Sequence, residues 1–195
     1  IGKHIILDDE RCILCSRCIR FMQEVAHDDV LGFVDRGSHT KLTVHPGQRL
    51  DSNYSLNTVD LCPVGALTSK DFRFQMRVWF LRETKSICTT CGTGCNTVIG
   101  ARENKIVRQT TRQNDAVNSY WMCDRGRLNY SYLQRDDRLV RPAAREDGEL
   151  KYSTWPRIIA MLAAKLSAVP QGRTALLASA RMTNEELWLA KKLAG

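Results

Sequence analysis

Three cysteines recur at intervals of three residues near the start of the chain and constrain its fold more than any other feature. They are Cys12, Cys15 and Cys18, and Cys62 follows forty-four residues after the third of them, with Pro63 directly behind it. Three thiolates from one short segment and one from a distant position are typical of a cubane [4Fe-4S] cluster. A proline after the fourth ligand ends any helix there and limits the access of water. The pattern therefore predicts a [4Fe-4S] cluster at this first quartet of cysteines.

The spacing also predicts the local conformation around the first quartet. Residues three apart lie on the same side of a helical or near-helical turn, so such a turn would let the three thiols converge. Apolar residues continue at helical intervals through residues 15–27, and residues 8–10 (Asp-Asp-Glu) offer carboxylates for an N-cap and a first turn. We therefore expect the cluster to be held at the start of a helix.

The segment between Cys18 and Cys62 contains the signals of a hairpin and of a short helix. Residues 31–35 and 41–45 are strand-like and flank a turn, and residues 54–61 have helical apolar spacing. The short helix would carry Cys62 back to the other three cysteines. The small residues that follow Cys62 would let backbone amides approach the cluster sulfurs.

A second quartet of cysteines repeats the three-plus-one arrangement. It consists of Cys88, Cys91, Cys95 and Cys123, and it predicts a second [4Fe-4S] cluster. Residues 92 and 94 are glycines, which we expect to adopt positive φ angles so that the backbone can wrap around the cluster. Residues 125 and 127 are arginines, whose positive charges would lie beside the cluster and raise its reduction potential.

Strand signals surround the second quartet, and a different composition follows it. Residues 77–81 are strand-like, and residues 96–100 and 105–109 read as two strands joined by a polar turn at residues 102–104. Residues 135–148 are charged and irregular, which is typical of a linker.

The last part of the chain predicts the beginning of a further domain. We expect a helix capped by Thr154, a buried strand at residues 174–178 and a helix capped near Thr183. This is how an α/β domain begins, and its few strands suggest that a larger domain has been cut. The predicted fold class is α+β: two small iron-sulfur modules, residues 1–75 and 76–140, followed at 141–195 by a linker and the start of a truncated α/β domain.

Composition and charge exclude several classes of protein. The eight cysteines fall in two tight groups without a signal peptide, so metal or cluster binding in a reducing compartment fits better than a disulfide scaffold. The formal charge is +8, but thiolates and cluster iron would bring it to roughly +4, which weakens a nucleic-acid reading. The apolar run at 158–169 contains Lys165 and is too short to span a bilayer. Because the chain opens without methionine, we expect a fragment or a processed chain.

The order of these motifs and their residue sequences resemble those of one known family. Both cysteine quartets, the phrase Asp-Leu-Cys-Pro-Val-Gly-Ala-Leu-Thr at 60–68 and the phrase Cys-Asp-Arg-Gly-Arg at 123–127 closely resemble the large iron-sulfur subunit (the G subunit) of bacterial NADH-quinone oxidoreductase, respiratory complex I. Residues 82–140 also resemble the cluster-binding segment of molybdopterin oxidoreductases, and residues 150–195 the start of their α/β domain. Such a domain in complex I carries no pterin.

The resemblance implies an electron-transfer subunit of a proton-translocating oxidoreductase, with two [4Fe-4S] clusters as cofactors. Electrons would pass from NADH through flavin on a neighbouring subunit, along the clusters, and on to quinone. The partners implied are the flavin- and NADH-binding subunit and a downstream iron-sulfur subunit. No nucleic acid and no membrane insertion are implied. The location implied is the peripheral arm on the cytoplasmic side of the bacterial inner membrane.

By this resemblance, the first quartet corresponds to the ligands of a family cluster that lies on the electron path. The second corresponds to a cluster found in some bacterial members, for which a structural and an electron-storing role are both open. Family members begin with a [2Fe-2S] domain and a cluster held by one histidine and three cysteines, whereas this chain has no cysteine before Cys12. We expect no acid, base or nucleophile, and no substrate chemistry on this fragment alone.

Three alternatives remain open at this point. Two four-cysteine zinc sites would make the protein a structural scaffold, although zinc ligands usually come as two separated pairs. The chain could instead be the iron-sulfur part of an NAD-linked formate dehydrogenase or hydrogenase complex, which shares these modules. A purely structural subunit is the third alternative.

Overall fold

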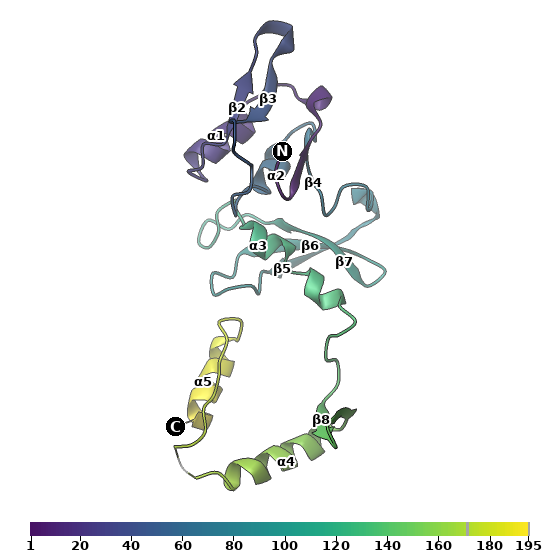
Figure 1. The fold of residues 1–195 in the computed structure, drawn as a ribbon, viewed down its shortest axis with the longest axis vertical. Helices are drawn as coiled ribbons and strands as arrows, with labels where there is room; N and C mark the ends of the chain where they lie inside the picture. Colours follow the sequence, from purple (N-terminus) through teal and green to yellow (C-terminus); the bar gives the residue numbers. More distant parts are fainter. Residues whose placement is uncertain (171, 195) are drawn as a thin grey trace. The chain divides into compact units, whose positions relative to one another are not determined.

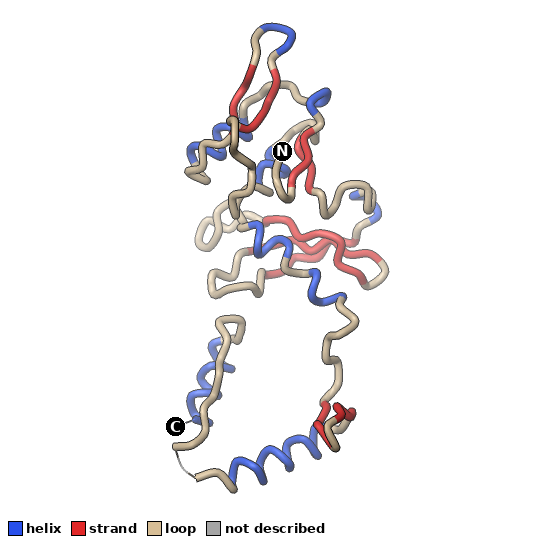
Figure 2. The backbone as a smooth tube through the Cα atoms, in the orientation of Figure 1, coloured by secondary structure: helices blue, strands red, loops and turns tan. Residues whose placement is uncertain are grey.

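The computed structural model describes residues 1–170 and 172–194, and the chain divides into two compact units, Ile1–Ser131 and Tyr132–Gly195. Both cysteine quartets belong to the first unit. Each unit contains helices and strands (Figures 1 and 2), so the mixed α+β class is confirmed. The finer division at residues 75 and 140 stays a prediction.

The N-terminal part of the first unit is built from two small antiparallel pairs of strands and two short helices. The strands β1 and β4 pair with each other, and the strands β2 and β3 form the predicted hairpin. The elements are β1 (Ile5–Leu7), η1 (Asp9–Arg11), α1 (Arg17–Glu24), β2 (Leu31–Val34), η2 (Gly37–His39), β3 (Lys41–Val44), α2 (Asn57–Leu61) and β4 (Leu67–Ser69). The predicted helices over 15–27 and 54–61 are thus present with shorter bounds.

These elements pack around the hydrophobic core of the first unit. Each contributes the apolar side chains that its periodicity directs inward, because helix positions three or four apart and alternate strand positions share one face. The buried core residues are Ile5, Phe21, Met22, Val30, Leu31, Leu42, Leu50, Leu56 and Leu67. The core therefore lies between α1, the hairpin and the β1–β4 pair, directly beside the first quartet.

A three-stranded antiparallel sheet dominates the part of the first unit around the second quartet. Its order is β5 (Arg82–Ile87), β6 (Asn96–Arg102), β7 (Lys105–Thr111). Glu103 and Asn104, between β6 and β7, both have positive φ, 49° and 62°, which suits a tight turn that matches the twist of the strands. The two strands and the polar turn are therefore confirmed. The short helix α3 (Asp124–Leu128) follows Cys123.

One expectation for this part was wrong. Residues 77–81 are not a strand, because Val78–Phe80 form a turn of 3₁₀ helix, η3. The strand lies one step further on, in β5, whose sequence Arg-Glu-Thr-Lys-Ser-Ile is almost wholly polar and exposed. A strand with little apolar alternation carries no period-two signal, and it forms here because it pairs with β6 along six residues.

The second unit contains a hairpin and two helices. They are η4 (Ser131–Gln134, which begins at the last residue of the first unit), β8 (Ala143–Glu146), β9 (Glu149–Tyr152), α4 (Trp155–Ser167) and α5 (Asn184–Ala194). The predicted linker, residues 135–148, thus contains the strand β8 and the turn of the β8–β9 hairpin. Both residues of this turn, Asp147 and Gly148, have positive φ. Both predicted helices are present. Thr183 and Glu186 cap α5 reciprocally, at 3.2 and 2.8 Å.

The predicted strand at residues 174–178 is wrong. This segment has no regular structure, and Leu177 is 97% exposed. Its apolar run has no strand beside it in the described part of the second unit, and a strand without a partner leaves its backbone groups unpaired. Among residues 1–170 and 172–194, no helix has both the length and the apolar character that crossing a membrane requires.

Candidate iron-sulfur centres

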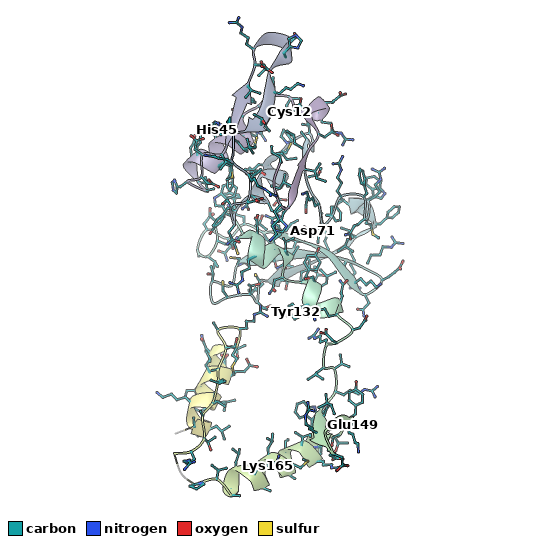
Figure 3. All side chains as sticks on the ribbon, in the orientation of Figure 1. Cys12, His45, Asp71, Tyr132, Glu149 and Lys165 are labelled. Carbon is teal, nitrogen blue, oxygen red and sulfur yellow. The ribbon has the colours of Figure 1, made fainter. Side chains whose placement is uncertain are left out.

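A loop, rather than a helical turn, presents the first cysteines of the first quartet. Cys12, which is labelled in Figure 3, ends η1 in an extended conformation, and α1 begins only at Arg17. Leu14 and Ser16 are left-handed, with φ of 55° and 59°. These two residues turn the chain between successive cysteines, so the expectation of a helical turn there was wrong. Asp8 occupies the N-cap position of η1, with Asp9 and Glu10 in its first turn, whereas Ser16 occupies that position of α1. The expected N-cap therefore belongs to a turn of 3₁₀ helix and not to the helix after it.

The four cysteines of the first quartet line one cavity. It encloses about 350 Å³ of space that is partly open to solvent. Apart from Ser16 and Arg17, the other residues of its wall are apolar: Ile13, Leu14, Phe33, Leu42, Val64, Ala66 and Leu67. The structure thus brings the four predicted cysteines to one largely apolar cavity, where Cys15 is exposed and Cys12, Cys18 and Cys62 are half-buried.

The surroundings of this cavity oppose the ionisation of its thiols. Burial, together with the negative charges of Cys12 and Cys15, raises the pKa of the Cys18 thiol to about 11. The backbone N–H of Ala66 donates a hydrogen bond to Cys62 Sγ at 3.2 Å, as the small residues after Cys62 led us to expect. Iron favours the thiolate form of its ligands and would offset the cost of gathering these charges.

A close backbone approach brings two thiols of the second quartet together. Cys123 is the N-cap of α3, and the Gly126 N–H donates to its sulfur at 3.2 Å. A Cβ at Gly126 would lie 3.1 Å from Cys88 Sγ and 3.2 Å from Cys123 Sγ. The two sulfurs therefore face the same point, and only glycine leaves room for them there.

The other two cysteines of the second quartet lie near this pair. Burial raises the pKa of Cys95, and the negative charges of Cys88, Cys123 and Cys91 raise it further. Cys91 behaves differently, because hydrogen bonds from Thr93 lower its pKa and the charge of Arg125 adds to that effect.

The two glycines of the second quartet have different conformations. Gly94 has the predicted positive φ, 63°, whereas Gly92 does not, so only one of the two expectations is confirmed.

In the described part of the chain, no three His, Cys, Asp or Glu side chains converge closely enough to hold one metal ion directly. The first-quartet thiols therefore share the wall of a cavity rather than a single point.

Five polar residues connect the two quartets, and we call them the inter-module hub: Ser55, Asn57, Asp60, Asp124 and Arg127. Asp124 accepts hydrogen bonds from Ser55 Oγ at 2.6 Å and from the Leu56 N–H at 2.9 Å. Its burial raises its pKa, which these bonds oppose. Asn57 Nδ2 donates to the Met122 carbonyl at 2.9 Å. The helix that leads to Cys62 is thereby bonded to the segment around Cys123.

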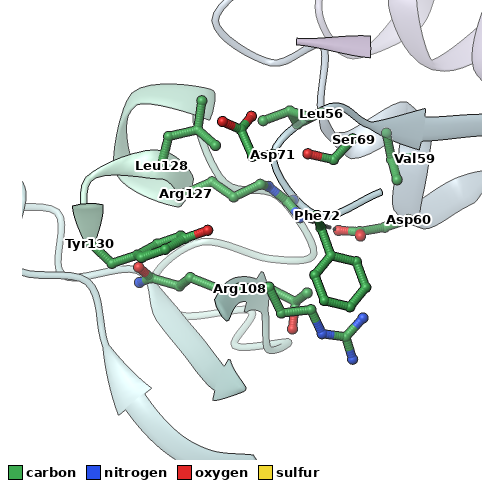
Figure 4. Close-up of a pocket in the computed structure, with 12 residues that line it drawn as sticks. Leu56, Val59, Asp60, Ser69, Asp71, Phe72, Arg108, Arg127, Leu128 and Tyr130 are labelled. Carbon is green, nitrogen blue, oxygen red and sulfur yellow. Dashed lines mark hydrogen bonds and ion pairs between the residues drawn. The ribbon is translucent and has the colours of Figure 1, made fainter. Parts of the chain in front are cut away.

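The hub corrects the prediction for Arg127. Its guanidinium donates to Asp60 at 2.7 Å (Figure 4) and to Asn57 at 3.2 Å, so its charge is directed at the hub instead of the second quartet. Arg125 is the arginine whose charge acts on a cysteine. Sequence reasoning missed the hub because its members are distant in sequence. The only signal in the sequence was an aspartate near the last cysteine of each quartet. Asp60 lies two residues before Cys62, and Asp124 directly follows Cys123.

Comparisons with known proteins assign both regions to iron-sulfur domains. Residues 2–68 match the model of the ferredoxin-like domain of NADH-quinone oxidoreductase subunit 3. Residues 81–135 match the Fe4S4 domain of molybdopterin oxidoreductases. Each match contains one complete cysteine quartet.

Curated relatives match the whole chain. The G subunit of the NADH-quinone oxidoreductase of Streptomyces coelicolor is 38% identical over 195 residues, which are 100% of this chain and 23% of the relative. Subunit 3 of the Thermus thermophilus enzyme is 38% identical over 195 residues, 100% of this chain and 24% of the relative. The G subunit of the Mycobacterium tuberculosis enzyme is 34% identical over 198 residues, 100% and 24%.

The chain is a homologue of NADH-quinone oxidoreductase G subunits. It spans about a quarter of the length of these relatives. The two matched domains indicate iron-sulfur clusters as cofactors. These findings favour iron-sulfur chemistry over the zinc sites that the cysteine spacing alone left open.

Proposed function

We propose that this G-subunit homologue carries single electrons through two [4Fe-4S] clusters in an NADH-quinone oxidoreductase, from the flavin side toward quinone. Cys12, Cys15, Cys18 and Cys62 hold the first cluster. Cys88, Cys91, Cys95 and Cys123 hold the second. The observation that carries this proposal is that all eight cysteines of the chain fall into two sets of four, each inside one matched iron-sulfur domain.

The donor sets fit the proposed cofactors. Four thiols around one cavity supply one ligand to each iron of a cubane. At both quartets a backbone N–H donates to the sulfur of the last cysteine, from Ala66 and from Gly126. Such bonds stabilise the negative charge that a bound cluster places on its sulfurs.

The chemistry belongs to the cofactor, and the chain's residues control its surroundings. A bound cluster takes up and returns one electron at a time. The thiolates fix its position, the apolar wall of the first cavity limits water, and the inter-module hub holds the two ligand sets at a constant separation. None of these roles requires a general acid, a general base or a nucleophile.

The partners and the location are part of the same proposal. A flavin- and NADH-binding subunit would deliver electrons, and a downstream iron-sulfur subunit would accept them. The arm that contains these subunits would lie on the cytoplasmic side of the bacterial inner membrane. Residues 1–75 and 76–140 would be the two cluster modules, and residues 141–195 the linker and the beginning of the domain related to molybdopterin oxidoreductases.

Ligand substitutions in the full-length subunit within its complex test the proposal. Cys62→Ala should remove the paramagnetic signal of one reduced cluster and Cys123→Ala that of another, each with a loss of four iron and four sulfide per complex, as expected for a cubane. Ile13→Ala, a non-ligand substitution between two ligands, is the matched control and should keep both signals. Unchanged iron content and spectra in Cys62→Ala would reject the assignment of the first quartet.

A further inference from the structure

Two threonines of the second quartet are hydrogen-bonded to the sulfurs of its cysteines. Cys88 Sγ donates to Thr90 Oγ1 at 3.4 Å, and Cys91 Sγ donates to Thr93 Oγ1 at 3.5 Å. A thiolate at either position has no proton and would instead accept from the hydroxyl. Each threonine follows its cysteine by two residues. The hydrogen-bonding surroundings of the second quartet therefore include side chains as well as backbone.

A third residue fixes the direction of the hydrogen bond at Thr90. Asn129 Nδ2 donates to Thr90 Oγ1 at 2.9 Å. An amide nitrogen has no acceptor capacity, so Thr90 must be the acceptor in that contact and keeps its single proton for another partner. A cysteine that ligates iron is a thiolate, which can only accept. The Thr90 hydroxyl is thereby oriented to donate to Cys88 Sγ.

The helix α3 links the orientation of the Thr90 hydroxyl to the position of a ligand cysteine. Cys123 is the N-cap of α3 and Asn129 is its C-cap, so one five-residue helix positions both the fourth thiol and the residue that holds Thr90. Around the first quartet, the described residues provide a backbone donor, Ala66, and an apolar wall, but no side-chain hydroxyl bonded to sulfur. The threonine contacts thus distinguish the second quartet from the first.

We propose that Thr90, oriented by Asn129, is a positioning residue that raises the reduction potential of the cluster at the second quartet, with Thr93 as a second donor. Reduction adds one negative charge, and part of it resides on the cysteine sulfurs. A hydroxyl proton directed at sulfur stabilises the reduced state more than the oxidised one. This inference rests on the proposed function, because it requires a cluster at the second quartet.

The test uses the full-length subunit in its assembled complex, with potentials measured by a redox titration followed by low-temperature paramagnetic resonance. In Thr90→Val, which keeps the shape and loses the hydroxyl, the equilibrium constant for one-electron reduction of the second cluster should fall by about tenfold, which corresponds to a potential lower by about 59 mV. Thr90→Ser, which keeps a hydroxyl, should restore most of the wild-type value. Asn129→Leu should shift the potential in the same direction by less.

A control and a spectroscopic readout separate this effect from a structural one. Thr89→Val changes the exposed threonine next to Thr90 and should leave the potential of the second cluster unchanged. In D₂O, pulsed paramagnetic resonance should detect an exchangeable deuteron near the reduced cluster in the wild type, and this coupling should weaken in Thr90→Val. The potential of the first cluster should stay the same in every variant.

Each result has a definite meaning. A wild-type complex without iron at the second quartet would reject the proposed function itself. A cluster that is present with an unchanged potential in Thr90→Val, or a shift of equal size in Thr89→Val, would overturn the role of Thr90 and leave the proposed function intact. If Thr90→Val loses the iron of the second cluster, the Asn129→Leu variant provides the test instead, because Asn129 is placed to act on the sulfur through Thr90. An unchanged potential and deuteron coupling in that variant would overturn the inference.

Discussion

The first cysteine quartet lies against an apolar core, whereas the second lies among polar side chains beside a sheet. The nine core residues all belong to residues 1–67. In the described residues 82–131, by contrast, the buried apolar side chains are Met122 and Cys88 itself, while Asn96, Thr97, Gln109, Asp124 and Arg127 are buried polar residues.

This difference indicates two ways of supporting a cluster. Around the first quartet, burial of apolar area stabilises the chain with or without the cofactor. Around the second, we expect order to depend on hydrogen bonds and on the proposed cluster, because metal binding contributes directly to folding where a core is small. Substitutions in the two regions test that contrast, beginning with the ligands themselves.

Loss of a ligand should disorder the second region more than the first. In Cys123→Ala, backbone amides of β6 and β7 should exchange with solvent at least about 100-fold faster, equal to about 2.7 kcal/mol of opening free energy. In Cys62→Ala, amides of α1 and the β2–β3 hairpin should change by less than about tenfold, because the core remains. Hydrogen exchange with mass spectrometry on the full-length subunit measures both. Equal losses in the two variants would contradict the contrast.

Truncation of a core side chain should be costly in the first region. Leu31→Ala removes a fully buried side chain from β2 and should lower the free energy of unfolding by about 2–5 kcal/mol, through lost burial and the cavity left behind. Val34→Ala, in the same strand but 43% exposed, is the matched control and should cost less than about 1 kcal/mol. Urea titrations of the two variants measure the difference. A similar cost in both would mean that this core does not support the first quartet.

Breaking the inter-module hub should have an intermediate effect. Arg127→Met leaves Asp60 and Asn57 without their donor, and since the Asp60 side chain is 36% exposed we expect a loss of about 1–3 kcal/mol, below that of a fully buried pair. Arg125→Met changes the exposed arginine of the same helix and should stay within about 0.5 kcal/mol. Thermal unfolding of both variants provides the comparison. If Arg127→Met matched its control, the hub would contribute no stability.

The sequence was sufficient for those features that depend on local pattern. Cysteine spacing predicted which thiols line the first cavity, and alternating apolar residues predicted the hairpin that carries Leu31 and Leu42, because both signals are local. The turn at Glu103 and Asn104 was likewise readable from polar residues between two strands.

Features that depend on distant partners were not predictable. The strand β5 exists because β6 lies beside it, and Arg127 is directed away from the second quartet because Asp60, sixty-seven residues earlier, accepts its hydrogen bond. The left-handed residues Leu14 and Ser16 gave no signal either, since neither is a residue type that favours positive φ. Such conformations are imposed by the surrounding structure.

The smallest effect concerns Tyr130, which connects the segment after α3 to the sheet. Its hydroxyl donates to the Val107 carbonyl at 2.8 Å, and Tyr130→Phe should therefore cost about 0.5–1.5 kcal/mol of unfolding free energy at neutral pH. Tyr120→Phe, at an exposed tyrosine, is the control and should cost little.

The pH dependence of that cost tests its origin. Burial, with the negative charge of Asp71 adding to it, raises the pKa of Tyr130 above its ordinary value of 10. The neutral phenol is therefore favoured in the folded state, so its contribution is fully present below pH 10 and is lost as the pH rises through the folded-state pKa. Urea titrations between neutral pH and about pH 11 should show the gap between wild type and Tyr130→Phe closing. If no gap appears at neutral pH, packing of the ring, which Tyr130→Phe keeps, holds this segment to the sheet instead of the buried hydrogen bond. The polar support of the second region would then be weaker than the contrast requires.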